Sequence, residues 1–290
     1  MNVTPTITQF CHQTWQLNAQ VQLTQVADDK CYIVTDKTPF HPVSHIWPDH
    51  PADKGSITIN GCSHDVIDCL VGAVELTSNT LYVDKAIPAK RDQEGWVFVV
   101  VHVVETEEVV VCAGDSVELT VNKAYQQALS RGHSAGHLAL LALNKILTVH
   151  GYWRKDAERK DPLGHYDFNN YAQETSTVSE NHCLDTYRLG KTLRKRGLNS
   201  GDVISDLDKI ENLINQQVNE WLVSASAVTM QCDGEHLTDS RYWRCDLSSD
   251  ESVVIPCGGT HVDSLTEITK IIITLREVEA NYIEMQTDVN

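Results

Sequence analysis

Apolar and polar residues alternate along the first third of the chain, and the clearest run extends from Trp15 to Val26. Such alternation is typical of an antiparallel strand with one buried face. Shorter runs follow, separated by Pro, Gly, Asn and Asp. We predict strands at Cys31–Thr35, Ser56–Asn60, Leu81–Asp84 and Trp96–Val104, with a closing hairpin of Val109–Cys112 and Val117–Val121. Many short strands at this spacing predict a small β-barrel domain over residues 1–122.

The pattern becomes helical from Ala124. The segment Arg131–Leu147 is rich in Ala and Leu, contains no proline and is apolar nearly all round, which predicts a buried helix. A second, amphipathic helix is expected to begin near Asp202 or Ser205. Further strands are predicted at Val228–Cys232, Tyr242–Leu247, Val253–Ile255 and Ile268–Arg276, and a strand and loop over Tyr171–Asp185. The predicted fold class is therefore α+β: an N-terminal small β-barrel, then an α+β domain over residues 123–290 with helices on an antiparallel sheet.

Two pairs of possible metal ligands stand far apart in the chain. His133 and His137 are four residues apart, so both imidazoles leave the same face of the predicted helix. Cys257 and His261 have the same spacing in a loop, with Gly258-Gly259 between them. Either pair alone also occurs by chance, but two successive glycines let the backbone turn tightly and bring the cysteine and histidine to one point. Three nitrogens and one sulfur suit zinc best, so we predict a zinc site from these four residues.

The string Cys-Gly-Gly-Thr-His-Val at residues 257–262, together with His-x-x-x-His on a helix, resembles the alanyl-tRNA editing family. This family comprises AlaX-type proteins and the editing domains of alanyl- and threonyl-tRNA synthetases. Asp115–Val121 and Glu267-Ile268 resemble the flanks of its two motifs, and the resemblance runs from about Thr38 to the end of the chain. It implies a β-barrel in the N-terminal part, as in the longer family members. It also implies a zinc-dependent hydrolase that acts in trans and removes serine or glycine from mischarged alanine tRNA.

The resemblance gives zinc a catalytic role, in which it polarises a water or the ester carbonyl of an aminoacyl-tRNA. Four protein ligands taken by themselves are more typical of a structural site. Glu267 matches a family position near the metal loop and Thr260 offers a hydroxyl, so both are candidate catalytic residues; a surface carboxylate and a turn-orienting hydroxyl are the alternatives. Asp263 is a candidate partner for a ligand imidazole. Ser134 stands where zinc peptidases of the His-Glu-x-x-His type have their glutamate, which disfavours a peptidase.

The chain carries a net charge of −17, which argues against broad attraction to nucleic acid. One basic cluster stands out, and it is either a solvated surface turn or a patch that contacts tRNA phosphates. Its residues, the candidate substrate-binding residues, are Arg188, Lys191, Arg194, Lys195 and Arg196. No run approaches the roughly 18 apolar residues that cross a bilayer, and the first residues lack the pattern of a secretory signal. Together with nine irregularly spaced cysteines, these features lead us to expect a cytoplasmic protein with no membrane partner.

The sequence departs from the family in two places. Thr38-Pro39-Phe40 resembles the start of a family loop that contains a Gly-Gly-Gln run, but after it only Asp53 and Gly55 fit. Three histidines lie in this loop between prolines, and we expect a polar, partly exposed loop and not a second metal site. The three are His41, His45 and His50. The first metal motif also has Gly132 where the family commonly has threonine.

These observations leave three hypotheses. The leading one is a zinc-dependent deacylase whose partner is aminoacyl-tRNA, namely alanine tRNA carrying the wrong amino acid. The second is a zinc hydrolase on the same scaffold that acts on a small ester or amide, which the acidity and the altered loop favour. The third is a non-catalytic binding protein with a closed, structural zinc site. The sequence leaves the oligomeric state open.

Overall fold

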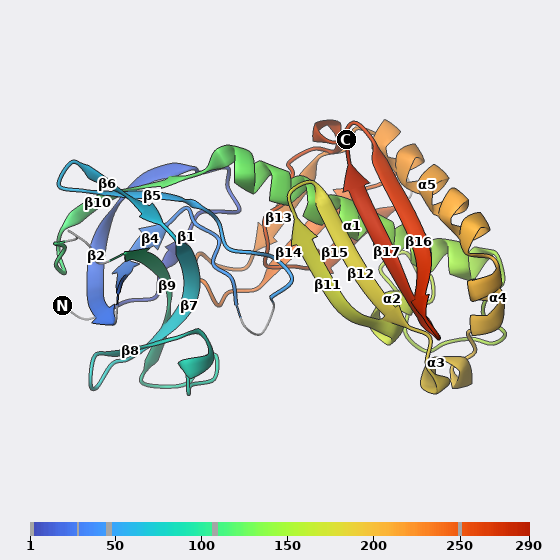
Figure 1. Cartoon of the computed structure of the whole chain (residues 1–290), viewed down its shortest axis with the longest axis horizontal. Coiled ribbons are helices and arrows are strands. Elements are labelled where there is room, and N and C mark those ends of the chain that lie inside the picture. The colour runs from blue at the N-terminus through green and yellow to red at the C-terminus, as the bar shows by residue number, and fades with distance from the viewer. Residues whose placement is uncertain (1–2, 28, 45–47, 106–109, 249–250) are drawn as a thin grey trace. The chain divides into compact units, whose positions relative to one another are not determined.

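The computed structural model describes residues 3–27, 29–44, 48–105, 110–248 and 251–290. They form two compact units that interleave in sequence (Figure 1). The first unit consists of residues 1–126, 232–241 and 258–260, and the second of residues 127–231, 242–257 and 261–290. A division into two domains after residue 122 remains our prediction.

The first unit is built on a sheet of eight antiparallel strands in the order β6-β5-β10-β2-β3-β9-β7-β8. The strict alternation of β2 places Ala19 and Val21 in the core while Gln16 and Gln20 stay exposed. A short parallel pair, β1 (Ile7–Thr8) and β4 (Lys37–Thr38), lies outside this sheet. The eight strands are β2 (Gln16–Ala27), β3 (Lys30–Thr35), β5 (Gly55–Ile59), β6 (Cys62–Val66), β7 (Asp68–Glu75), β8 (Thr80–Val83), β9 (Trp96–Glu105) and β10 (Ser116–Val121).

The α+β class is confirmed, but the eight-stranded sheet is not closed into a barrel, since β6 and β8 remain its edges among the described residues. The predicted closing hairpin is wrong. Residues 110–112 form no strand, and Val109 lies outside the described residues. The backbone N–H of Cys112 instead donates to the Asp115 carboxylate at 2.8 Å, which fixes a turn. As a result β10 pairs with β2 on one side and β5 on the other.

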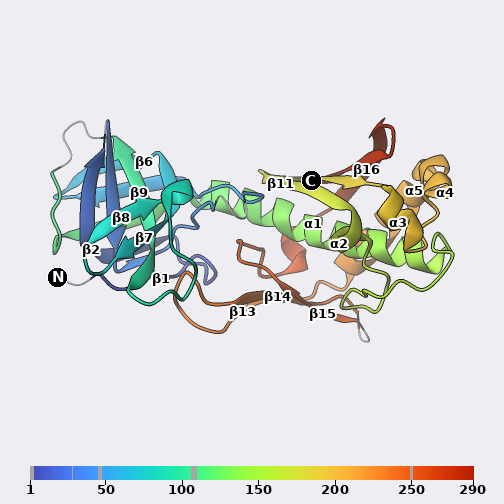
Figure 2. The same ribbon diagram turned by 90° about the horizontal axis from the view of Figure 1, so that it is seen from below.

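The helix α1 (Lys123–Val149) is the central element of the second unit. Figure 2 shows it between the four-stranded and the three-stranded sheets of that unit. Leu138, Leu141 and Leu147 on it are fully buried. The predicted helix over Arg131–Leu147 is therefore confirmed, and its apolar character nearly all round follows from being covered on both sides.

The four-stranded sheet has the order β11-β12-β17-β16, and the three-stranded sheet the order β13-β14-β15. The predicted amphipathic helix is α5 (Leu207–Val223), and Asn215 ties it to β16 by exchanging two hydrogen bonds with the backbone of Ile273 at 2.7 and 2.8 Å. The strands are β11 (Gln173–Ser179), β12 (His182–Arg188), β13 (Val228–Cys232), β14 (Arg241–Asp246), β15 (Ser252–Pro256), β16 (Ile271–Glu279) and β17 (Tyr282–Val289). The shorter helices are α2 (Phe168–Ala172), α3 (Lys191–Lys195) and α4 (Ser200–Ser205). None of the helices in the described part of the chain combines the length and apolar character needed to cross a bilayer.

Candidate metal centre

The helix α1 supplies His133 and His137 from one face. Both residues are buried, with 8% of their surface exposed, and their ring centroids are 4.9 Å apart. Burial lowers the pKa of His137 to about 4, so its imidazole is neutral at pH 7. A neutral imidazole is the form that binds a metal ion.

The hairpin of β14 and β15 delivers the other two residues. Tyr242 pairs with Pro256 at the end of this ladder, so Cys257 leaves the sheet directly after it. The ring of His261 then stacks on that of His133, with centroids 4.1 Å apart. Neither Gly258 nor Gly259 has a positive φ, and a Cβ at Gly258 would meet open space. Cys257 and His261 do come to one point across the two glycines, and the turn needs neither a positive φ nor, at Gly258, the absence of a Cβ.

The four side chains converge on one point. The Sγ atom of Cys257 lies 3.5 Å from Nε2 of His133, 3.4 Å from Nε2 of His137 and 3.2 Å from Nε2 of His261. All four ligand atoms lie within 4.8 Å of one another. In a tetrahedral zinc site, sulfur and nitrogen ligands stand about 3.6 Å apart, given bond lengths of about 2.3 and 2.1 Å. The cluster can hold a metal ion, and its spacing fits zinc.

Two further residues, absent from the predicted site, shape this cluster. Trp243 on β14 is fully buried and stacks on His137, with centroids 5.1 Å apart and an interplanar angle of 17°. Ser134, also fully buried, has its Oγ atom 3.0 Å from Nδ1 of His261 and accepts from the backbone N–H of Val262 at 3.2 Å. Since Nε2 of His261 faces the cluster, Nδ1 carries the proton and donates to Ser134. This bond fixes both the tautomer and the direction of the ring.

We expect Ser134→Ala to weaken zinc binding by about tenfold or more, the usual effect of removing a partner that orients a ligand. The measurement is a competition titration of the purified variant with a chromophoric zinc chelator. Ser200→Ala is the matched control, because Ser200 is another buried serine of the second unit and contacts no ligand. Equal zinc affinities for the two serine variants would show that Ser134 does not orient His261.

The two candidate catalytic residues have other partners in the structure. Thr260 is buried in the first unit, with its hydroxyl 3.2 Å from Nε2 of His50. Nδ1 of His50 lies 2.9 Å from the carbonyl oxygen of Pro51, which can only accept, so Nε2 is the acceptor and Thr260 donates. The Glu267 carboxylate accepts from the backbone N–H groups of Asp263 and Ser264 at 2.9 and 3.2 Å, in the capping box of a short 3-10 helix. Catalytic roles for Thr260 and Glu267 remain predictions.

Asp263, the third candidate, is exposed, and no hydrogen bond joins its carboxylate to a ligand imidazole among the described residues. Partial desolvation of its carboxyl group raises the pKa of Asp263, and the charge of Glu267 raises it further.

The histidine loop is partly exposed, as predicted, at Pro48 and Lys54, but two of its histidines are buried. His41 and His50 are buried, with 8% and 3% of their surface exposed, while His45 lies outside the described residues. The carboxylate of Asp53 organises this segment, because its Oδ2 atom accepts from the His41 backbone N–H at 2.7 Å and from the Gln126 side chain at 2.6 Å. Burial raises the pKa of Asp53 to about 7. The family-like aspartate therefore has a structural task in the first unit.

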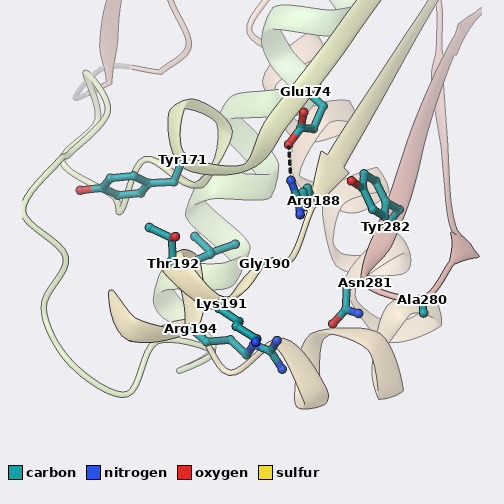
Figure 3. A pocket seen from close by; sticks show the side chains of 11 residues that line it. Tyr171, Glu174, Arg188, Gly190, Lys191, Thr192, Arg194, Ala280, Asn281 and Tyr282 are labelled. Carbon is teal, nitrogen blue, oxygen red and sulfur yellow. Dashed lines mark ion pairs between the residues drawn. The ribbon is translucent and has the colours of Figure 1, made fainter.

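Part of the basic cluster lines a cavity in the second unit. Arg188, Lys191 and Arg194 line this cavity, whose volume is about 630 Å³ (Figure 3). Lys195 and Arg196 do not line it, and the guanidinium of Arg196 lies over the ring of Tyr171 at 4.6 Å. The segment is a short helix, α3, where one reading of the sequence predicts a turn, and Leu193 is buried beneath it. Lys191, Arg194, Lys195 and Arg196 are exposed to solvent, as that reading also predicts.

Comparison with curated proteins relates the chain to alanine–tRNA ligases. It is 25% identical over 268 residues to the alanine–tRNA ligase of Caldivirga maquilingensis, which covers 92% of this chain and 25% of the ligase. It is 25% identical over 193 residues to that of Saccharolobus islandicus, covering 65% of this chain and 19% of the ligase. The third example, from Caldicellulosiruptor saccharolyticus, is 24% identical over 243 residues, covering 83% and 22%. The chain thus spans a quarter or less of the length of these relatives. No family model matches it.

Fold and cluster define an α+β protein with three histidines and one cysteine arranged to hold a metal ion. Over most of its length the chain is a homologue of alanine–tRNA ligases, consistent with an AlaX-type editing domain.

Proposed function

We propose that this chain is a zinc-dependent hydrolase that removes serine or glycine from mischarged alanine tRNA, acting in trans. The observation that carries the proposal is the convergence of His133, His137, Cys257 and His261 on one point. The relationship to alanine–tRNA ligases supports aminoacyl-tRNA as the substrate.

Zinc held by these four residues would supply Lewis acidity toward the ester carbonyl or a water. Residues of the chain orient the metal ligands and shield them from water. Ser134 holds His261 in one tautomer, and the stacked ring of Trp243 keeps water from one face of His137. The low pKa of His137 keeps this ligand neutral at physiological pH. Thr260, which directly precedes His261 in the chain, remains our candidate for a hydrogen bond to the substrate.

The donor set itself favours one rival function. Four protein ligands are typical of a closed, structural zinc site. In that case the chain would be a binding protein whose zinc only holds the β14–β15 hairpin against α1. The two functions differ in what metal removal does: a structural zinc stabilises the fold without supporting hydrolysis.

The test measures deacylation of alanine tRNA that carries serine or glycine. Alanine tRNA that carries alanine is the control substrate. We expect the purified chain to release serine and glycine faster than alanine, to lose this activity when a chelator removes the metal, and to regain it on addition of zinc. Activity should be lost without the metal because the ester carbonyl then has no Lewis acid to polarise it. A chain with one bound zinc and no hydrolysis of either ester would refute the proposal and leave the structural role.

A further inference from the structure

The cavity beneath α3 lies at one end of the four-stranded sheet. Arg188 is the last residue of β12 and pairs directly with Tyr282, the first residue of β17. Their neighbours Tyr187 and Ile283 are fully buried, so Arg188 and Tyr282 are on the outer face of the sheet. The backbone N–H of Leu189 donates to the carbonyl of Asn281 at 2.7 Å and fastens the β16–β17 turn to the start of α3. The cavity therefore has a rigid wall of paired backbone.

The cavity is positively charged in a strongly negative chain. Three cations, Arg188, Lys191 and Arg194, line it against one carboxylate, Glu174, while the whole chain carries −17. The Arg188–Glu174 contact spans 3.9 Å between side chains that are 58% and 48% exposed, so it binds neither group strongly. Within the described residues, Lys191 and Arg194 take part in no ion pair. Figure 3 shows these two side chains extending side by side toward Asn281. This arrangement suits an anion.

An aromatic ring stands next to these cations. Tyr282 is half-buried and lines the cavity, and the guanidinium of Arg188 lies 5.8 Å from its ring centroid. The ring of Tyr282, beside the Arg188 guanidinium, can stack on a base or a ribose. The side chains of Lys191 and Arg194 can pair with a phosphate. The volume of about 630 Å³ is ample for both parts of a nucleotide.

We propose that this cavity binds one nucleotide unit of an RNA, with the phosphate at Lys191 and Arg194 and the ribose or base against Tyr282. That this RNA is the tRNA substrate rests on the proposed function. The cavity would then be a second anchor for the substrate, separate from the point where the ester is cleaved.

The separation follows from the course of α1 within the second unit. Backbone bonds from Asn199 to Tyr152 and between Trp153 and Leu198 fasten the segment after α3 to the chain just beyond α1. From His137 to Val149 the helix rises about 18 Å, at about 1.5 Å per residue. Figure 2 shows α3 toward the end of the second unit where α1 ends. At about 3.4 Å per stacked nucleotide, this stretch of α1 is as long as about five nucleotides. The cavity therefore selects substrates longer than the last few nucleotides.

The test uses the whole chain and a fluorescein-labelled RNA hairpin that copies the acceptor stem and 3′ end of alanine tRNA. We expect the double variant Lys191→Gln, Arg194→Gln to raise the Kd in fluorescence anisotropy by about tenfold or more, because two phosphate contacts are lost, and to reduce the salt dependence of binding. The control double variant Lys85→Gln, Arg91→Gln removes the same two charges at exposed sites of the first unit and should change the Kd less than about twofold. Equal Kd values for the two double variants would overturn the proposal. Tyr282→Ala provides an independent variant, expected to weaken binding about fivefold or more through lost stacking.

Deacylation separates this proposal from the function on which it rests. We expect the Lys191→Gln, Arg194→Gln variant to hydrolyse a seryl-tetranucleotide ending in CCA as fast as the unchanged chain, and the seryl-hairpin at least about fivefold more slowly at low substrate. If the variant hydrolyses both substrates as fast as the unchanged chain, the RNA-binding role of the cavity is refuted but the deacylase function is not. If RNA binding depends on Lys191 and Arg194 but no substrate is hydrolysed, the deacylase function is refuted and the RNA-binding role of the cavity stands.

Discussion

Replacing Cys257 with alanine is expected to lower the bound zinc from one ion per chain to less than about a tenth of that, and to reduce deacylation by about a hundredfold or more. The reason is geometric. The Cys257 sulfur is the point shared by the cluster, at 3.2–3.5 Å from the Nε2 atoms of all three histidines. Without it the three imidazoles keep no anionic partner for a divalent cation. The measurement is metal content by mass spectrometry after dialysis, together with the rate on seryl-tRNA.

The control is Cys62→Ala, which removes an exposed thiol of β6 in the first unit and should leave zinc content and rate unchanged. Cobalt gives a second readout that does not depend on activity. A cobalt-loaded chain should show a thiolate-to-cobalt charge-transfer band, which Cys257→Ala abolishes and Cys62→Ala keeps. Full zinc content in Cys257→Ala would contradict the assignment of the metal site itself.

The metal cluster was the part of the site most open to prediction from sequence. The spacing of His133 and His137 places both imidazoles on one face of a helix, and the Ala- and Leu-rich segment around them predicts that helix. The spacing of Cys257 and His261 matches a known string but gives no distance to α1. That distance comes from the β14–β15 ladder, which no local pattern encodes.

Ser134 and Trp243 were missed for different reasons. A serine inside a helix carries no signal by itself, and its partner His261 lies 127 residues away. Trp243 has the pattern of an ordinary core residue of a strand, and only the packing of β14 against α1 places its ring on His137. The cavity has the same character. Its cations form a visible cluster, whereas Tyr282 joins them through the pairing of β12 with β17.

The unclosed sheet shows where periodicity alone falls short. β6 contains Ser63, His64 and Asp65, and β7 begins with Asp68, so neither shows the clean alternation that identified β2. Val117, Leu119 and Val121 alternate well, yet alternation does not say which strands lie beside them. Strand order depends on contacts distant in sequence, which is why the elements of the first unit were easier to predict than their arrangement.

Gly132 stands where the editing family commonly has threonine, and the structure gives the reason for a glycine here. A Cβ atom at Gly132 would lie 2.6 Å from both the backbone nitrogen and the oxygen of His182, and 2.7 Å from the Ser179 oxygen. The turn between β11 and β12 is held against α1 at this point, since the N–H of Asn181 donates to the carbonyl of Ala128 at 2.8 Å. No side chain fits between the helix and this turn.

Restoring the family's residue by Gly132→Thr is therefore expected to destabilise the second unit by about 2–3 kcal/mol, even though glycine is a poor helix former. The obstacle is backbone and cannot move aside like a flexible side chain, so α1 must shift and carry His133 with it. For a unit of this size the melting temperature should fall by about 5–10 °C, and zinc affinity should fall as well. Calorimetry of the metal-free and zinc-loaded chains measures both effects.

Gly258→Ala is the matched control, because Gly258 also adjoins a ligand but faces open space, so its melting temperature should change by less than about 2 °C. Gly136→Ala is expected to be intermediate, since its Cβ would meet the side chain of Cys183 at 2.9 Å, and a side chain yields more easily than backbone. This ranking separates crowding from helix propensity, which would favour all the helical substitutions. A Gly132→Thr chain as stable as the original, with unchanged zinc affinity, would mean that α1 and the β11–β12 turn are further apart than the structure has them.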